Sequence, residues 1–479
     1  MKHIGTGNTP YELSQLIILA QKWIDSERIK SGVLSFFDTR YEQSELQKLL
    51  TRLTFKQALD TPLFQFLVHF YHKIGFSALP SKLFRDLVIA RIVDPVSKRK
   101  TQDILQSRFG KQYALTTIYR TLRDCCRLHY QQQIETIIKQ FIERHLGIRI
   151  AVLFFDVTTL YYEAFDEDDL RQCGWSKEQK HNQPQIVIAL IVTTQGIPLA
   201  LRMFPGNTFE GHTLFPCITE VMEQFILFPK RIVIVADAAM LNQDNLEELE
   251  EKQMKYIVGA RLGNVSDSLF KKITKVPGKD GANRRIPLVN KRIMVVGYSA
   301  QRAKKDKFDR EKQIEKANEM LLKPSSVVKR YKFIAAVGKD QYRLNKELIE
   351  KAEKLEGLKG YVTNATALTN KAIMKRYNEL WQIEKAFRMS KSDLKARPIF
   401  HSAKESIEAH LLMVFTALVI ARYVELSTHQ SIAHIIQILS PVKEVIVEDN
   451  LSKQRVSQYT SLTEEARKLA KLAKIPCVT

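Results

Sequence analysis

Three side chains that could act on a phosphate group recur at steps of seven residues towards the C-terminal end of the chain. They are Tyr377, Glu384 and Lys391. Two turns of an α-helix take about seven residues, so a helix here would place all three on one face. A carboxylate can bind a divalent cation, while an ammonium and a phenol hydroxyl can bind phosphate oxygens. The spacing indicates a metal-dependent reaction on a phosphate, although a solvated helix face often carries the same residue types.

Two further carboxylates end short apolar runs that predict buried strands. Asp156 ends a run that begins at residue 148, and Asp237 ends a β-branched run that begins at residue 231. Open α/β sheets build their sites where strands meet loops, although a lone Asp there is often a turn or helix cap. If the strands are neighbours, the two carboxylates can share a cation, and a helix packed on them can bring Glu384 to a second one. Two cations about 3.5–4 Å apart would stabilise both oxygens of an in-line phosphoryl displacement.

Together these residues resemble the insertion-sequence DDE transposases of the cut-and-paste type, whose catalytic core is ribonuclease H-like. The group carries a Tyr-x-x-Arg-x-x-x-Glu-x(6)-Lys signature, and Tyr377, Glu384 and Lys391 stand in that register. Leu380 occupies the Arg position, which removes one expected phosphate-contacting guanidinium. Arg388 is a nearby basic residue that could replace it, as is Lys385.

Other segments match the same family in the same order, and the resemblance covers roughly residues 80–425. The second Asp is followed by Ala238 and Ala239, where similar proteins commonly have a basic residue and a glycine. The matching segments are residues 174–177 with Lys180 and His181, residues 196–199, residues 204–207 with Glu210, and residues 394–401 with His410.

The resemblance implies a metal-dependent DNA transposase. Asp156, Asp237 and Glu384 would be the catalytic residues and would bind two Mg²⁺ ions, with Mn²⁺ as a substitute. Water would cleave a strand at each element end, and the freed 3′-hydroxyl would then attack target DNA at the same site.

Four further residues of the signature helix are expected to contact DNA. Tyr377 and Lys391 would position the backbone near the cleaved bond, and Arg388 is expected to bind DNA as well. Trp381 lies one turn beyond Tyr377 and could stack on an unpaired base, although a place in the protein core is its more common role. The partners implied are double-stranded DNA with terminal inverted repeats, target DNA, and a second copy of the chain in a dimer on DNA.

The bulk composition agrees with a nucleic-acid partner. The 479 residues include 74 lysines and arginines against 52 aspartates and glutamates, a formal net charge of +22. Such an excess points first to nucleic acid, although many basic proteins bind DNA only non-specifically. The five cysteines contain no CxxC pair, which argues against a zinc site or a disulfide scaffold and suits a bacterial cytoplasm or nucleoid. The longest apolar run, residues 411–421, is too short to span a bilayer, so no membrane partner is expected.

The element pattern predicts an α/β ribonuclease H-like catalytic core with a β-rich insertion, preceded by an all-α N-terminal region. The core is expected over residues 148–261 and 371–425, because the gap from Asp237 to Glu384 is much longer than the gap between the two Asp residues. The gap itself, 262–370, is the expected insertion, with β-type runs and a charged helix over 303–322. Residues 426–479 are expected to form a helical C-terminal region. Core strands are predicted at 148–156, 184–194, 197–204, 232–237 and 255–260, with a hairpin between the second and third.

The helical region over residues 1–147 contains a possible DNA-binding unit at 81–147. Helices are predicted at 83–93, from residue 97 through 105, and from 115 onward, which resembles a helix-turn-helix arrangement. Thr116, Thr117 and Arg120 open the third helix and could reach base edges in a major groove. An ordinary helical bundle with a basic surface fits the same pattern.

Three other functions stay open. A catalytically inactive, transposase-derived DNA-binding protein is disfavoured by the three intact carboxylates, although Leu380 and Ala238 leave room for it. A glycosidase with a carboxylate pair is disfavoured by the charge and by the lack of an aromatic-rich sugar cleft signature. A repeat scaffold is disfavoured because no internal repeat occurs.

Overall fold

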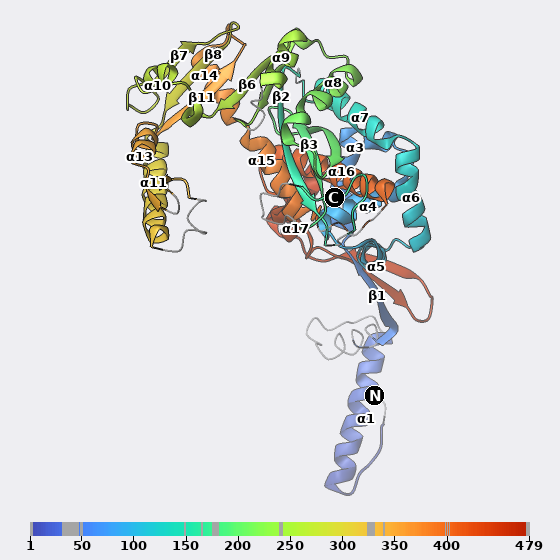
Figure 1. Cartoon of the computed structure of the whole chain (residues 1–479). Helices are drawn as coiled ribbons and strands as arrows, with labels where there is room; N and C mark the ends of the chain where they lie inside the picture. Colours follow the sequence, from blue (N-terminus) through green and yellow to red (C-terminus); the bar gives the residue numbers. More distant parts are fainter. Residues whose placement is uncertain are drawn as a thin grey trace. The chain divides into compact units, whose positions relative to one another are not determined.

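The structure is a computed structural model that divides into two compact units (Figure 1). One unit comprises Met1–Leu59 with Lys443–Ser461, and the other comprises Asp60–Val442 with Leu462–Thr479. The residues that the structure describes are 3–30, 47, 51–147, 150–163, 166–174, 182–238, 243–322, 331–338, 341–397, 399, 401 and 403–475.

The smaller unit contains helix α1 (Pro10–Lys30) and an antiparallel sheet in the order β1-β12-β13. Its strands are β1 (Leu53–Leu59), β12 (Glu444–Asp449) and β13 (Arg455–Tyr459). The predictions of an all-α N-terminal region and of a helical C-terminal region are therefore wrong at these strands. Strand β1 could not be recognised from its neighbours in the sequence, because it pairs with β12, almost 400 residues further along the chain.

Helices of the larger unit surround the long apolar helix α16 (Lys404–Thr428). α16 packs against α3, α4 and α6 and is buried along most of its length. By length and composition it could cross a membrane, but 94% of its most apolar window is buried inside the protein, as expected of a core helix. The predicted helices of residues 83–127 are confirmed. The N-terminal helices are α3 (Thr61–Ile74), α4 (Lys82–Val93), α5 (Lys98–Phe109), α6 (Leu115–Arg127) and α7 (Tyr130–Arg144).

The centre of the larger unit is an eight-stranded mixed sheet in the order β4-β3-β2-β5-β6-β11-β8-β7. β2, β3 and β4 pair antiparallel, while β2 with β5 and β5 with β6 pair parallel, so the predicted mixture of pairings is confirmed. The strands are β2 (Val152–Tyr161), β3 (Gln185–Val192), β4 (Pro198–Pro205), β5 (Val233–Ala236), β6 (Lys255–Ala260), β7 (Asn283–Pro287), β8 (Ile293–Tyr298) and β11 (Leu358–Thr363).

The sequence predicted the hairpin between β3 and β4 correctly but placed the end of the first core strand too early. The hairpin between β3 and β4 is confirmed, because the Gly196 N–H donates to the Thr193 carbonyl at 2.8 Å and Gly196 has a φ of 75°. The predicted end of the first strand at Asp156 is wrong. β2 continues to Tyr161, because Val157 and Leu160 remain buried and the pairing with β3 extends over these residues.

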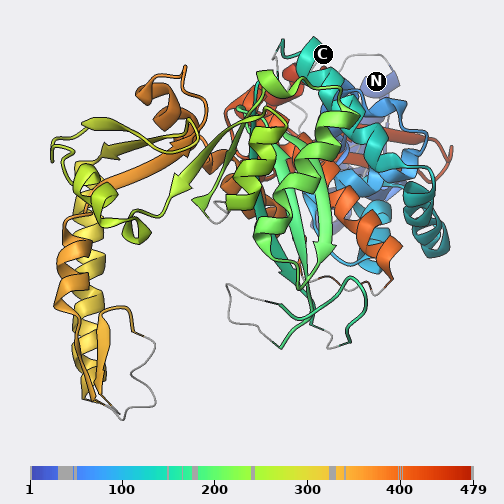
Figure 2. The same cartoon turned by 45° about the horizontal axis from the view of Figure 1, so that its top comes forward.

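Residues 262–370 are not set apart from the central sheet, because β11 pairs with β6 and joins β8 and β7 to its edge. The predicted charged helix is α11, and it packs beside α13 (Figure 2). Arg310 of α11 binds Glu356, with Nε 2.6 Å from Oε1. The other elements here are α10 (Asp267–Ile273), α11 (Ala300–Leu321), α13 (Lys346–Glu353) and a hairpin of β9 (Ile334–Gly338) and β10 (Gln341–Leu344).

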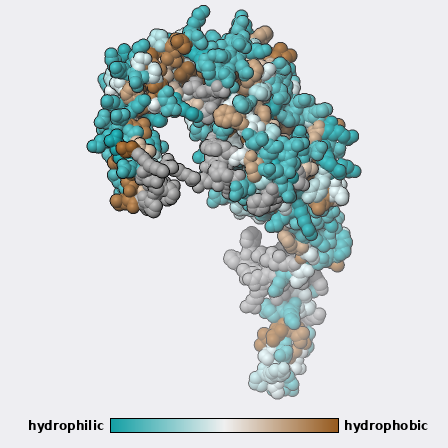
Figure 3. Space-filling view, in the orientation of Figure 1, coloured by the Kyte–Doolittle hydropathy of each residue, from teal (hydrophilic) through white to brown (hydrophobic). Residues whose placement is uncertain are grey.

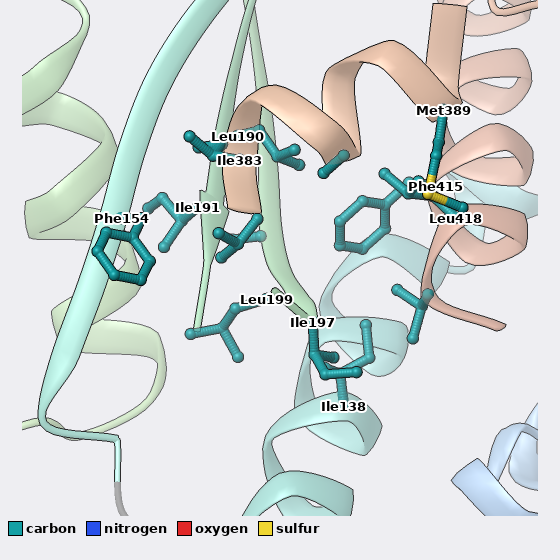
Figure 4. Close-up of a cluster of buried hydrophobic side chains, with 14 of the residues drawn as sticks. Ile138, Phe154, Leu190, Ile191, Ile197, Leu199, Ile383, Met389, Phe415 and Leu418 are labelled. Atoms are coloured by element: carbon teal, nitrogen blue, oxygen red, sulfur yellow. The ribbon is translucent and has the colours of Figure 1, made fainter. Parts of the chain in front are cut away.

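The helix that follows α14 (Asn370–Asn378) is anchored to the sheet by apolar packing. This helix, α15 (Trp381–Arg388), contacts β2 and β3. In Figure 4, Ile383 lies beside Leu190, and Met389 lies against Phe415 and Leu418. The remaining α-helices are α8 (Leu214–Gln224), α9 (Gln243–Glu251), α17 (Ile432–Leu439) and α18 (Glu464–Leu472).

Shortening Ile383 should destabilise the fold through this anchor. Ile383 is 1% exposed, and Ile→Ala changes in a packed core cost about 2–5 kcal/mol. We expect Ile383→Ala to lower the free energy of unfolding by that amount in urea denaturation. Arg388→Ala, at an exposed position of the same helix, is the control and should change it by less than about 0.5 kcal/mol. Equal losses in the two variants would contradict the anchoring role.

Candidate active site

Asp156 and Asp237 occupy adjacent positions on neighbouring parallel strands. Phe155 of β2 is paired with Ala236 of β5, so the next residue on each strand is one of the two acids. Each carboxylate accepts a hydrogen bond from the N–H of the residue that follows it. The distances are 2.8 Å from Val157 to Asp156 Oδ1 and 2.6 Å from Ala238 to Asp237 Oδ1. The strands therefore bring the two predicted carboxylates together and fix their orientation.

Tyr377 reaches this pair from helix α14, which packs on β5 and β6. Its hydroxyl donates to Asp237 Oδ1 at 3.1 Å, and its ring meets Tyr361 edge-on with centroids 4.9 Å apart. Burial, and then the negative charge of Asp237, raise the pKa of the Tyr377 hydroxyl, so it stays protonated and remains a donor at neutral pH. Gly259 makes this approach possible, since a Cβ there would stand 2.3 Å from the Tyr377 oxygen.

Glu384 does not share one continuous helix with Tyr377, so that prediction is wrong. α14 ends at Asn378 and α15 begins at Trp381. The N–H groups of Leu380, Gln382 and Ile383 each bond to the carbonyl three residues earlier, which tightens the chain into a 3₁₀-like turn. Glu384 is exposed in the first turn of α15. Its charge and that of Asp237 both act on Lys359 of β11, so tertiary packing rather than a seven-residue period determines its position.

Two basic residues predicted to bind DNA, Arg388 and Lys391, follow Glu384 and lie on two different helical elements. Lys391 lies in a single π-helical turn, η6 (Met389–Asp393), and is half-buried. Turns of this kind are frequent at functional sites. Arg388 ends α15 and is exposed. Lys385, the other candidate to replace the signature Arg, binds Glu425 instead, with 2.7 Å between Nζ and Oε2.

Lys359 is a site residue that the sequence did not identify. It lies on β11, and its Nζ is 4.7 Å from the centroid of the Tyr377 ring. Burial, and then the charge of Arg302, lower the pKa of Lys359, while the negative charges of Asp237 and Glu384 oppose that shift. Lys359 is therefore within electrostatic reach of two of the three carboxylates. The sequence signal that could have identified Lys359 is that it is the one charged residue in the strand Leu358–Thr363.

Trp381 is not a core residue, in contrast to its more common role. It is 50% exposed and lines a cavity of about 530 Å³ with Lys371, Lys375 and Asn378. An exposed indole beside two lysines is suited to a base and its flanking phosphates.

The residues predicted to read DNA bases lie on a different element from the carboxylates. Thr116 and Arg120 are exposed and Thr117 is half-buried on the first turns of α6. That helix packs on α16, α5 and α7 through its other side, where Ile118 and Leu122 are buried. The structure does not bring these three residues to the carboxylates. The family-like segment at residues 175–181 lies outside the described residues.

The donor atoms at the site suit a hard divalent cation, because Mg²⁺ prefers carboxylate oxygens. Asp156 and Asp237 would hold it from the sheet, and Glu384 is the third candidate. Within the described part of the chain, however, no three His, Cys, Asp or Glu side chains are grouped closely enough to hold one metal ion. One oxygen of Asp237 is engaged by Tyr377 and Ala238.

The model of the transposase DDE domain matches residues 148–420, which is more than half of the chain. The chain belongs to the transposase DDE domain family. The matched stretch contains all three carboxylates, Tyr377 and Lys391, and transposases of this family generally use divalent metal ions. The expected resemblance is thereby confirmed.

Two further comparisons add little to this DDE transposase assignment. No curated protein matches the sequence. Among solved structures, the chain is similar to the piggyBac transposase in a cryo-EM synaptic complex with hairpin DNA, at a TM-score of 0.39 and 9% sequence identity. The similarity covers 80% of this chain and 79% of the other. A TM-score of 0.39 is too low to carry an argument about fold or function.

Adding a methyl group at Gly259 should displace Tyr377 from Asp237. The new Cβ would lie 2.3 Å from the Tyr377 oxygen and 3.1 Å from Cζ. We expect Gly259→Ala to reduce metal-dependent DNA cleavage by about tenfold or more, since one charge-assisted hydrogen bond is lost. Gly263→Ala is the matched control, because a Cβ there would meet nothing within 4 Å. Equal cleavage rates for the two variants would show that the contact with Asp237 is dispensable.

Proposed function

We propose that the chain is a DNA transposase that cleaves strands at the ends of its element and joins them to target DNA. The observation that carries this proposal is the pair Asp156–Asp237 on adjacent parallel strands, with Tyr377 bonded to Asp237, inside the family-matched region. Asp156, Asp237 and Glu384 would hold two Mg²⁺ ions. When bound, such ions activate water and stabilise a leaving 3′-oxygen.

A ribonuclease H-like core is part of the proposal. It is supported by the order β4-β3-β2-β5-β6, in which an antiparallel hairpin pair is followed by two parallel pairings. The carboxylates lie where β5 ends beside the middle of β2. Asp237 is exposed there and Asp156 is half-buried, so we propose that the substrate approaches from the side of Asp237.

The residues around the carboxylates orient them and bind the DNA backbone. Tyr377 and the N–H of Ala238 hold Asp237 Oδ1, and the N–H of Val157 holds Asp156 Oδ1, so both acids are oriented before DNA binds. Lys359 and Lys391 would then contact phosphate oxygens near the cleaved bond.

Lys359 replaces the cation that the signature helix lacks. Leu380 is 8% exposed and packed in the core, so no side chain at that position reaches a phosphate. Lys385 is bound to Glu425. Lys359 comes from β11, with its Nζ 4.7 Å from the centroid of the Tyr377 ring, and is within electrostatic reach of Asp237 and Glu384.

A larger DNA surface is also proposed. Trp381 with Lys371 and Lys375 would hold an unpaired base and its phosphates, and Thr116, Thr117 and Arg120 on α6 would contact duplex DNA. The visible face in Figure 3 is largely hydrophilic, with small scattered apolar patches. The charge of +22 supplies the long-range attraction. Joining two element ends in one reaction requires two active sites, so a dimer on DNA is expected.

Replacing one carboxylate should separate cleavage from DNA binding. With Mg²⁺ and labelled DNA from the flanks of this gene, wild type should cut at the element end. Asp237→Asn and Glu384→Gln should abolish cutting while retaining affinity, because binding rests on many phosphate contacts. Gel analysis of the products together with a binding titration is the measurement. Cleavage by Asp237→Asn at the wild-type rate would refute the assignment.

One observation favours a second function for this chain, that of a catalytically inactive, transposase-derived DNA-binding protein. No group of three metal-binding side chains is assembled among the described residues. Under this alternative, wild type and both carboxylate variants would bind the DNA equally, and none would cut it with Mg²⁺ or Mn²⁺.

Removing the charge of Lys359 should weaken catalysis more than DNA affinity. A hydrogen bond to a charged group contributes about 1.5–3 kcal/mol, so Lys359→Met should lower kcat by about 10- to 100-fold. Lys359→Arg should restore part of the rate because it restores the positive charge. Lys354→Met, at an exposed position near the end of α13, is the control. A rate for Lys359→Met that equals the control would assign Lys359 a packing role only.

A further inference from the structure

Four basic side chains gather between α4, the start of α5, the segment around Ala396 and α16. They are Arg91, Lys98, His401 and His410, here called the basic cluster. Lys98 Nζ lies 3.3 Å from His410 Nδ1, and the rings of His401 and His410 have centroids 5.6 Å apart. Burial, and after it nearby positive charges that include Arg91, lower the pKa of each of the other three.

Three members of the basic cluster are buried, and His401 is half-buried at its margin. Arg91 is 6% exposed, and Lys98 and His410 are each 4% exposed. His410 Nε2 lies 3.2 Å from the carbonyl oxygen of Ala396, which can only accept, so Nε2 carries the proton and Nδ1 accepts from Lys98. Burial lowers the pKa of His410 well below its usual value, which keeps this imidazole neutral.

No carboxylate of the described residues is paired with Arg91 or Lys98. Asp94, which lies between Arg91 and Lys98 in sequence, has its Oδ2 3.8 Å from Arg108 Nη1. Arg91 itself forms no hydrogen bond or ion pair with the residues that the structure describes. The contrast is Arg202 of the same unit, which binds both oxygens of Glu135 at 2.6 and 3.2 Å.

An arginine in this position needs a negative partner. A guanidinium keeps its proton at neutral pH, and burying an unpaired charge is strongly unfavourable. We infer that the basic cluster is a binding site for one small oxyanion of the phosphate type. Arg91 would bind two of its oxygens with its planar fork of N–H groups, and Lys98 would bind a third. Lys98 also begins the twelve-residue helix α5, whose N-terminus favours an anion.

Free inorganic phosphate and a phosphate of the DNA backbone offer the same chemistry. The burial of Arg91, Lys98 and His410 favours the free ion, because a DNA strand needs an open groove for the nucleotides on either side. The inference does not depend on the proposed cleavage reaction, since none of the four residues belongs to the carboxylate site.

Calorimetric titration of the full-length protein with sodium phosphate, at constant ionic strength and without DNA, tests the inference. Wild type should bind one phosphate per chain with saturation. Arg91→Met and Lys98→Met should each weaken that binding by tenfold or more. Lys100→Met, two residues along α5 and exposed, should bind as wild type does, which separates the site from general attraction to a basic protein.

A second titration, with the protein saturated by duplex DNA, identifies the source of the oxyanion. Unchanged phosphate binding would assign the site to the free ion, and its loss would assign the site to a backbone phosphate. Absence of saturable phosphate binding by wild type would overturn the inference. Equal binding by wild type and both methionine variants would overturn it as well. The wild-type measurement stands even if one variant fails to fold.

Discussion

The parallel pairing of β2 with β5 is the constraint on which the candidate site depends. Its register pairs Phe155 with Ala236 and so makes Asp156 and Asp237 neighbours. A slip of one residue would turn one carboxylate to the opposite face of the sheet. β5 has only four residues, all buried, and it is also paired with β6. Apolar packing on both faces therefore holds the register that the chemistry requires.

The parts that the sequence predicted are those whose signal is local. Continuous apolar runs identified the strands that lead to Asp156 and Asp237, and helical periodicity identified α4 to α6. Strand β1 was missed because its partner β12 is almost 400 residues away, so nothing near Leu53–Leu59 shows what it pairs with. The same holds for Lys359, whose position beside Tyr377 depends on how β11 joins the sheet.

Tyr377 and Glu384 of the signature lie on two helices and not on the single helical face that their spacing predicted. Even steps of seven residues suggested one helical face, yet the chain is interrupted between Tyr377 and Glu384. Leu380 lies at that interruption and is buried. An arginine there would have to bury its charge or change the turn, whereas leucine stabilises the turn by packing. In the function that we propose, Lys359 approaches from β11 and supplies the positive charge that the helix lacks.

The buried arginines of the larger unit differ in whether the protein supplies a carboxylate partner. Arg202 is satisfied by Glu135, and Arg292 by Glu250 at 2.7 Å. Each of these pairs is complete without any ligand, so it contributes to the fold and not to binding. Arg91 has no such acid among the described residues. Because the same unit supplies a carboxylate to the other buried arginines, the lack of one at Arg91 is best explained by a negative charge that comes from outside the chain.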